Sequence, residues 1–141
     1  MSGQLDELMK PMPVPDADSG PYWHGANEGR FLFQRCATCR KAQFYPRSLC
    51  SHCQSRELNW EESKGRGKVA SFSVVHRAPI PAFKADSPYV VALIDLEEGF
   101  RFMCNVIRCD PQSVRIGDPV RIVYETRPGS YQKIPQAEQI R

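Results

Sequence analysis

Hydrophobic and polar residues alternate with a period of two in the second half of the chain. Three stretches, residues 67–77, 89–96 and 100–107, follow this pattern, which is typical of half-buried β-strands. One face of the first stretch carries Ala70, Phe72, Val74 and His76, and the other carries Ser71 and Ser73. The corresponding face of the third carries Phe100, Phe102, Cys104 and Val106. The second and third strands are joined by a short connection that contains Gly99, so we expect a hairpin.

Two further strands are expected at 120–124 and 129–134. Between the third and fourth strands, Asp110 and Pro111 can begin a single helical turn over 110–114. Five strands with a short helix between the third and fourth predict an oligonucleotide/oligosaccharide-binding (OB) barrel.

The first half of the chain predicts a short helix followed by a small ribbon. Asp18 or Ser19 can cap the helix, Pro21 falls in its first turn, and Gly29 can end it. One side of this helix carries Tyr22, Trp23 and Ala26. A lone helix of this length is marginal, so its aromatic side must pack, either on its own protein or on a partner.

Short strands at 31–35, 43–47 and 58–61 build the ribbon, and the polar, glycine-bearing segment 62–67 is the best boundary in the chain. The expected organisation is a flexible arm at 1–18, a helix and ribbon at 19–62, and a barrel at 66–141. Pro11, Pro13 and Pro15 oppose helix formation in the arm. The fold class is therefore mainly β, with an N-terminal helix, a small ribbon and a five-stranded barrel.

Four of the six cysteines form two Cys-x-x-Cys pairs within eighteen residues. They are Cys36, Cys39, Cys50 and Cys53. Two residues between cysteines let one tight turn present both thiolates to one ion, so the spacing predicts a structural zinc site. With four protein ligands the ion would have no open position for water and would act as a staple. His52 could replace a neighbouring cysteine, although four thiols already satisfy the ion.

The residue after the second cysteine of each pair is often glycine in such turns. Here it is Arg40 in the first turn and Gln54 in the second. If either adopts a left-handed conformation, the strain costs roughly 1 kcal/mol.

The chain carries a formal net charge of +3, and most of its excess basic residues lie in 24–68, with nine Lys and Arg against four Glu. Four thiolates and a zinc ion add a formal −2, which brings the chain to about +1. The basic excess is thus largely balanced at the metal, and a nucleic-acid partner is not favoured.

Catalytic motifs are sparse: no glycine-rich phosphate loop and no nucleophile elbow is present. His76 and Arg77 precede a long loop, 78–88, that contains Phe83 and Lys84. These groups either meet a phosphorylated or acyl ligand or are merely solvated. Cys104 is expected in the core, where burial raises a thiol's pKa, and Cys109 as a free thiol.

No apolar stretch is long enough to span a membrane, and the first residues lack the basic and apolar regions of a secretory signal. We therefore expect a cytoplasmic protein that does not bind membranes.

Several motifs together resemble a known family. They are Tyr22-Trp23 before Gly29-Arg30, the two Cys-x-x-Cys pairs around Phe44-Tyr45-Pro46-Arg47, the run from Gly67 to Arg77, and the run from Pro88 to Leu96. The family comprises small proteins with an N-terminal helix, a rubredoxin-like zinc ribbon and an OB-fold, formerly a domain of unknown function. The resemblance covers about residues 20–126.

The resemblance implies an accessory role. Members of this family typically bind thiolase-like enzymes that make or cleave carbon–carbon bonds in acyl-CoA substrates, and others pair with acyl-CoA hydratases. The OB-fold then completes the acyl-CoA entrance, while the partner supplies the catalytic Cys and His. By this reading Tyr22 and Trp23 dock the partner, and His76, Arg77, Phe83 and Lys84 approach CoA.

Three hypotheses follow. The favoured one is a non-catalytic subunit of a thiolase-type hetero-oligomer, with one structural zinc ion and a CoA thioester as the ligand of the complex. The alternative is a single-strand nucleic-acid-binding OB-fold protein. The third is an independent enzyme that uses Cys104 or Cys109 with His76.

Overall fold

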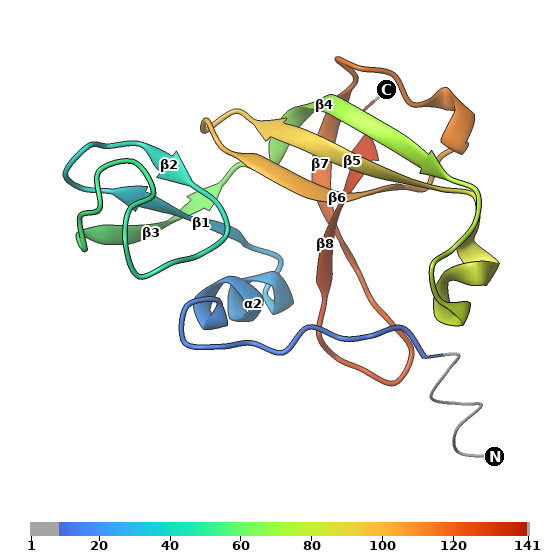
Figure 1. Ribbon diagram of the computed structural model, residues 1–141, viewed down its shortest axis with the longest axis horizontal. Coiled ribbons are helices and arrows are strands. Elements are labelled where there is room, and N and C mark those ends of the chain that lie inside the picture. Colours follow the sequence, from blue (N-terminus) through green and yellow to red (C-terminus); the bar gives the residue numbers. More distant parts are fainter. Residues whose placement is uncertain (1–8, 141) are drawn as a thin grey trace.

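The computed structural model describes residues 9–140, so residues 1–8 of the expected arm lie outside the described residues (Figure 1). The second half of the chain forms a closed barrel of five strands in the order β4-β5-β6-β8-β7. The strands are β4 (Arg66–Val75), β5 (Tyr89–Leu96), β6 (Arg101–Ile107), β7 (Pro119–Glu125) and β8 (Ile134–Gln139). A 3₁₀ turn, η2 (Pro111–Ser113), lies between the third and fourth strands. The predicted OB-fold is confirmed.

The last strand lies five residues later than the pattern predicts. β8 begins at Ile134, pairs antiparallel with β7, and pairs in parallel with β6 at Ala137. Residues 129–133 turn instead against α2 (Gly20–Asn27), where the Lys133 amide donates to the Asn27 side-chain oxygen at 2.8 Å. Three consecutive residues of β8, 135–137, are buried, because β6 and β7 flank the strand. Hydrophobic and polar residues therefore do not alternate along β8, and the sequence pattern does not predict it.

A β-bulge changes the inward face of β4. The pairing with β5 shifts register between Val69 and Ser71, so Val69, and not Ala70, is the fully buried residue there. β4 ends at Val75, and His76 is exposed beyond it. The alternating face predicted for 67–77 is thus interrupted by the bulge and ends before His76.

The first half forms α2 and a three-stranded sheet in the order β2-β1-β3. The strands are β1 (Phe31–Cys36), β2 (Ala42–Gln43) and β3 (Leu58–Ser63). β2 is shorter than the predicted strand at 43–47, because Tyr45 has a φ of 68° and Pro46 cannot donate to the ladder. At the start of α2, the Ser19 side chain does not cap the helix; it accepts from the Asp16 amide at 3.1 Å.

The ribbon and the barrel share one aromatic core. Phe31 and Phe33 of β1, together with Phe44, contact Phe100 and Phe102 of the barrel, with ring centroids 4.7–5.9 Å apart. The connection between β3 and β4 is Lys64-Gly65, shorter than the expected linker 62–67. The Glu98 carboxylate accepts from the Ser63 hydroxyl at 2.7 Å and from the Lys64 amide at 2.8 Å, which holds this connection against the β5–β6 hairpin.

Within residues 9–140, no helix is long and apolar enough to cross a membrane.

Candidate metal centre and ligand pocket

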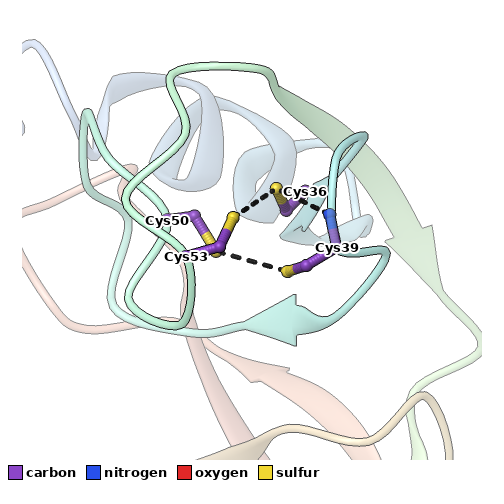
Figure 2. A group of neighbouring side chains, drawn as sticks. All are labelled: Cys36, Cys39, Cys50 and Cys53. Carbon is purple, nitrogen blue, oxygen red and sulfur yellow. Dashed lines mark hydrogen bonds between the residues drawn. The ribbon is translucent and has the colours of Figure 1, made fainter.

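Two tight turns bring the four cysteines of the ribbon together (Figure 2). Their sulfur atoms all lie within 4.8 Å of one another, and the Cys36–Cys53 and Cys39–Cys50 pairs are each 3.6 Å apart. A tetrahedral site with Zn–S bonds of about 2.3 Å requires sulfur atoms about 3.8 Å apart. The four side chains therefore have the number, softness and spacing that a zinc ion needs.

Backbone N–H groups of the same turns point at the sulfurs. The Cys39 amide lies 3.5 Å from the Cys36 sulfur, and the His52 amide lies 3.3 Å from the Cys50 sulfur. His52 thus contributes its backbone to the cluster of four cysteines, while its side chain is exposed.

These N–H groups prepare two of the cysteines to ionise. The Cys39 amide lowers the pKa of the Cys36 thiol to about 6. Desolvation opposes ionisation of Cys50, but hydrogen bonds from the Cys53 and His52 amides and from the Cys39 and Cys53 thiols together lower its pKa. The Ser55 amide also favours the Cys53 thiolate, but desolvation and the neighbouring thiols raise the Cys53 pKa to about 11. A divalent cation would relieve this crowding and allow all four thiolates to form.

Both turns end in a left-handed residue that is not glycine. Arg40 and Gln54 each have a φ of 64°, and their amides donate to the Cys36 and Cys50 carbonyls at 2.8 and 2.9 Å. Both residues thus adopt the left-handed conformation under which the sequence analysis expects strain.

Replacing either residue with glycine is expected to stabilise the metal-loaded protein. Arg40→Gly and Gln54→Gly should each raise the free energy of unfolding by up to about 1 kcal/mol, because the left-handed strain exceeds the added flexibility of the unfolded chain. Urea unfolding of the zinc-loaded variants measures the change. Lys41→Gly is the control, since Lys41 has no positive φ and should not gain stability. A loss of stability in all three variants would contradict the prediction.

Two buried glutamines hold the second turn onto the sheet. The Gln43 side-chain amide donates to the Gln34 side-chain oxygen at 2.7 Å. The Gln34 oxygen also accepts from the Arg47 amide at 3.0 Å, and the Gln43 oxygen accepts from the Ser51 amide at 2.8 Å. The sequence gives no signal for this pair, because a buried glutamine in a strand looks like a surface one.

The β4–β5 loop forms a pocket of about 520 Å³ that brings together three of the predicted CoA residues. His76, Arg77 and Lys84 all line it, and Lys84 belongs to a 3₁₀ turn, η1 (Pro81–Asp86). The nearby hydroxyl of Ser87, which also lines the pocket, is buried without a hydrogen-bond partner.

Phe83 does not join this pocket. Its ring lines a neighbouring groove of about 590 Å³, with Lys10 and Arg127 over it at 5.7 and 5.8 Å from the ring centroid. Phe83 is thus separated from the other three residues with which the sequence reading grouped it.

The two aromatic residues proposed for docking have different environments. Tyr22 is only 5% exposed, and its ring contacts Phe31 and Phe44 at 6.0 and 5.2 Å. Of the two alternatives left open for this ring, packing on its own protein is what the structure shows. Trp23 is partly buried against the same core and lines a hollow of about 370 Å³ with Tyr45, Met103 and other residues.

The two remaining cysteines lie on the barrel. Burial raises the pKa of the Cys104 thiol to about 12, so this sulfur is protonated at neutral pH and a poor nucleophile. The Cys109 sulfur lies 3.8 Å from the Val106 carbonyl oxygen and lines the groove beside Phe83.

Many of the basic side chains are engaged by carboxylates. Ion pairs at 2.7–3.4 Å join Arg30 with Glu62, Arg35 with Glu61, Arg101 with Asp95, and Arg121 with Glu138. Cations that are already paired offer little to a phosphate backbone.

The fold and the cysteine cluster together define a zinc-ribbon/OB-fold protein. Consistent with this class, the ChsH2 rubredoxin-like zinc ribbon domain model matches residues 23–59, and the ChsH2 C-terminal OB-fold domain model matches residues 60–125. A DUF35 domain-containing scaffold protein of Methanothermobacter thermautotrophicus is 40% identical over 92 residues, which are 64% of this chain and 68% of that protein. The chain belongs to the DUF35 family of zinc-ribbon/OB-fold proteins.

Two further similar chains belong to proteins named as an enzyme or an enzyme subunit. A probable enoyl-CoA hydratase alpha subunit of Thermomonospora curvata is 37% identical over 117 residues, 83% of this chain, but the match spans only 36% of that subunit. In the solved structure of the Ltp2-ChsH2(DUF35) aldolase, one chain superposes with a TM-score of 0.80 at 33% identity, covering 91% of this chain and 98% of that one.

Proposed function

We propose that this chain is a non-catalytic accessory subunit of a thiolase-type acyl-CoA complex that makes or cleaves carbon–carbon bonds. The likeness to a chain of the Ltp2-ChsH2(DUF35) aldolase over nearly the full length of both chains carries the proposal. The helix and ribbon at 19–62 and the barrel at 66–141 would act as its two lobes.

The proposed metal is one structural zinc ion. Cys36, Cys39, Cys50 and Cys53 would hold it, and with four thiolate ligands it supplies no site for substrate or water. Its contribution is to fix the two turns of the ribbon. Four cysteines that must remain reduced to bind a metal are typical of a reducing compartment, which supports a cytoplasmic location.

The proposed role in substrate binding falls on the β4–β5 loop pocket. CoA carries phosphate groups, and the three basic side chains His76, Arg77 and Lys84 converge on one hollow of the barrel surface. The catalytic Cys and His would then belong to the partner. Cys104 is buried and a poor nucleophile, and His76 is exposed beyond the end of β4, so this pair does not support an independent enzyme.

Recovery of the tagged protein from its native host, followed by native mass spectrometry, tests this function. We expect a stoichiometric thiolase-like chain that retains acyl-CoA. Co-elution of nuclease-sensitive RNA or DNA without such an enzyme would overturn the proposal and favour a nucleic-acid-binding OB-fold.

Removing the two permanent cations of the loop pocket is expected to weaken substrate binding. Arg77→Ala and Lys84→Ala should each raise the KM of the complex for acyl-CoA about 5-fold, with little change in kcat, because they remove charge-assisted bonds to phosphate. Steady-state kinetics of the reconstituted complex provide the measurement. The control is Lys68→Ala, which removes an exposed cation of β4 outside the pocket. Unchanged KM values in both pocket variants would refute the assignment.

A further inference from the structure

The described part of the N-terminal arm lies against the barrel. Figure 1 shows residues 9–18 running from α2 past the start of β8 and the β7–β8 connection toward the loop that carries η1. The arm is extended, with prolines at positions 11, 13 and 15, and it has no ladder partner, so side-chain contacts must hold its far end.

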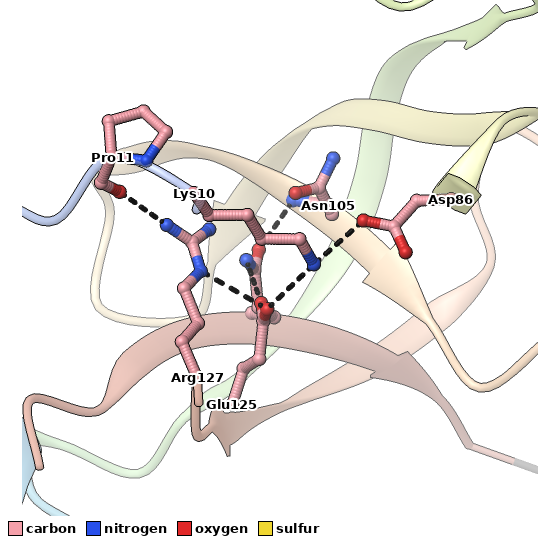
Figure 3. Close-up of polar contacts among 7 residues, drawn as sticks. Lys10, Pro11, Asp86, Asn105, Glu125 and Arg127 are labelled. Atoms are coloured by element: carbon pink, nitrogen blue, oxygen red, sulfur yellow. Dashed lines mark hydrogen bonds and ion pairs between the residues drawn. The ribbon is translucent and has the colours of Figure 1, made fainter. Parts of the chain in front are cut away.

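Lys10 supplies those contacts. Its Nζ atom lies 2.7 Å from Asp86 Oδ2 and 3.8 Å from Glu125 Oε1 (Figure 3). The same ammonium group lies 5.7 Å from the centroid of the Phe83 ring. One lysine thus joins the end of η1 to the end of β7, two segments that are far apart in the sequence.

The β7 side of this bridge is held firmly. The Glu125 carboxylate accepts from the Gln136 side chain at 2.7 Å and lies 3.3 Å from Arg127 Nε. Arg127 also donates to the Pro11 carbonyl at 2.8 Å, so it fixes the backbone of the arm next to Lys10. The side chains of Glu125 and Arg127 are only 21% and 12% exposed. This side of the bridge is therefore an anchor.

The η1 side is held weakly by its own loop. No residue of η1 is buried, and its internal bonds are long: the Phe83 amide donates to Ile80 at 3.2 Å and the Ser87 amide to Lys84 at 3.3 Å. Lys84, which lines the loop pocket, lies two residues before Asp86 on the same turn. A shift of Asp86 away from Lys10 therefore moves Lys84 as well.

We propose that Lys10 is a positioning residue for the loop pocket: by tying Asp86 to Glu125, it holds η1 so that Lys84 converges with His76 and Arg77 on an anionic ligand. This role rests on the proposed function, because the ligand is the phosphate portion of CoA. The arm thereby becomes part of the binding site without touching the ligand.

The first test measures the loop itself. In the full-length, zinc-loaded protein, Lys10→Gln removes the cation and should accelerate hydrogen exchange at the Phe83 and Ser87 amides about 5-fold, with ribbon amides unchanged. Lys10→Arg keeps the cation and should retain the wild-type rates. Arg101→Gln breaks an exposed ion pair elsewhere on the barrel, with Asp95, and serves as the matched control.

The second test measures ligand affinity, with coenzyme A as the probe, in the full-length protein and in its reconstituted complex. Lys10→Gln should weaken coenzyme A binding about 5-fold, and in the complex it should raise KM without lowering kcat. Lys10→Arg should restore both values.

The outcomes separate the two proposals. Unchanged exchange in Lys10→Gln, or faster exchange with unchanged coenzyme A affinity, overturns the positioning role. If wild-type protein binds no coenzyme A either alone or in the complex, the proposed CoA site itself is overturned, whatever the exchange rates show. Loss of affinity in Lys10→Gln with recovery in Lys10→Arg supports the inference.

Discussion

Loss of the ribbon metal is expected to unfold the barrel as well as the ribbon. Phe31, Phe33 and Phe44 belong to the ribbon and form one side of the core that Phe100 and Phe102 complete. Structural zinc contributes about 10–16 kcal/mol in zinc-finger peptides, which is comparable to the whole stability of a domain, about 5–15 kcal/mol. Thermal unfolding with and without a zinc chelator, followed by circular dichroism of the barrel strands, should show a single transition that shifts down by tens of degrees.

Substitution of the ligands provides the matched comparison. Cys36→Ser should lower the zinc content and produce the same shift, whereas Cys109→Ser should keep zinc and most of its stability. If the barrel melted at its normal temperature in the chelated protein, the two parts would be energetically independent.

The Phe31→Ala variant should show the second large effect, with a free energy of unfolding about 3–5 kcal/mol below that of the wild type. Phe31 is 2% exposed, and its ring contacts four other rings, Tyr22, Phe44, Phe100 and Phe102. Truncation leaves a cavity where the helix, ribbon and barrel meet. Urea unfolding of the zinc-loaded protein measures the loss.

Two further variants bracket this effect. Phe31→Leu keeps most of the volume and should cost less than half as much. Tyr131→Ala should change stability by less than about 0.5 kcal/mol, because that ring is 90% exposed. A loss below about 1 kcal/mol in Phe31→Ala would contradict the shared core.

The sequence predicts well the features that depend on local spacing. Two Cys-x-x-Cys pairs specify four ligands whatever surrounds them, and the period of two in 89–96 and 100–107 places the β5–β6 hairpin within one residue. The alternation is visible in the sequence because each of these strands has one buried face. The register of the hairpin is set by its own turn, so it does not depend on distant residues.

The sequence predicts poorly what depends on distant neighbours. β8 contains Pro135 and Gln136, which are rarely assigned to a core strand, and it is buried because β6 and β7 flank it. The bulge at Ala70 breaks the alternation on which the face assignment of β4 depends.

The site shows the same limit. The zinc ligands come from one short segment. Lys10, in contrast, contacts Asp86 and Glu125, which lie far from it in the sequence, and no local pattern connects the three residues. Phe83 lies next to Lys84 in the chain, yet the 3₁₀ turn directs the two side chains into different hollows. Which residues of a loop act together is decided by the turn geometry, which the sequence alone does not specify.

The parallel contact between β6 and β8 has a consequence for biosynthesis. The barrel cannot close until residues 134–139 have been made, whereas the ribbon needs only the first 63 residues and closes short loops. During translation we therefore expect a metal-loaded ribbon to form first, with Phe31, Phe33 and Phe44 facing solvent until Phe100 and Phe102 emerge to cover them. The nascent chain is most prone to aggregate after the ribbon has formed and before the barrel closes. The yield of folded protein would therefore depend on the supply of metal and on a chaperone that shields the exposed aromatic surface.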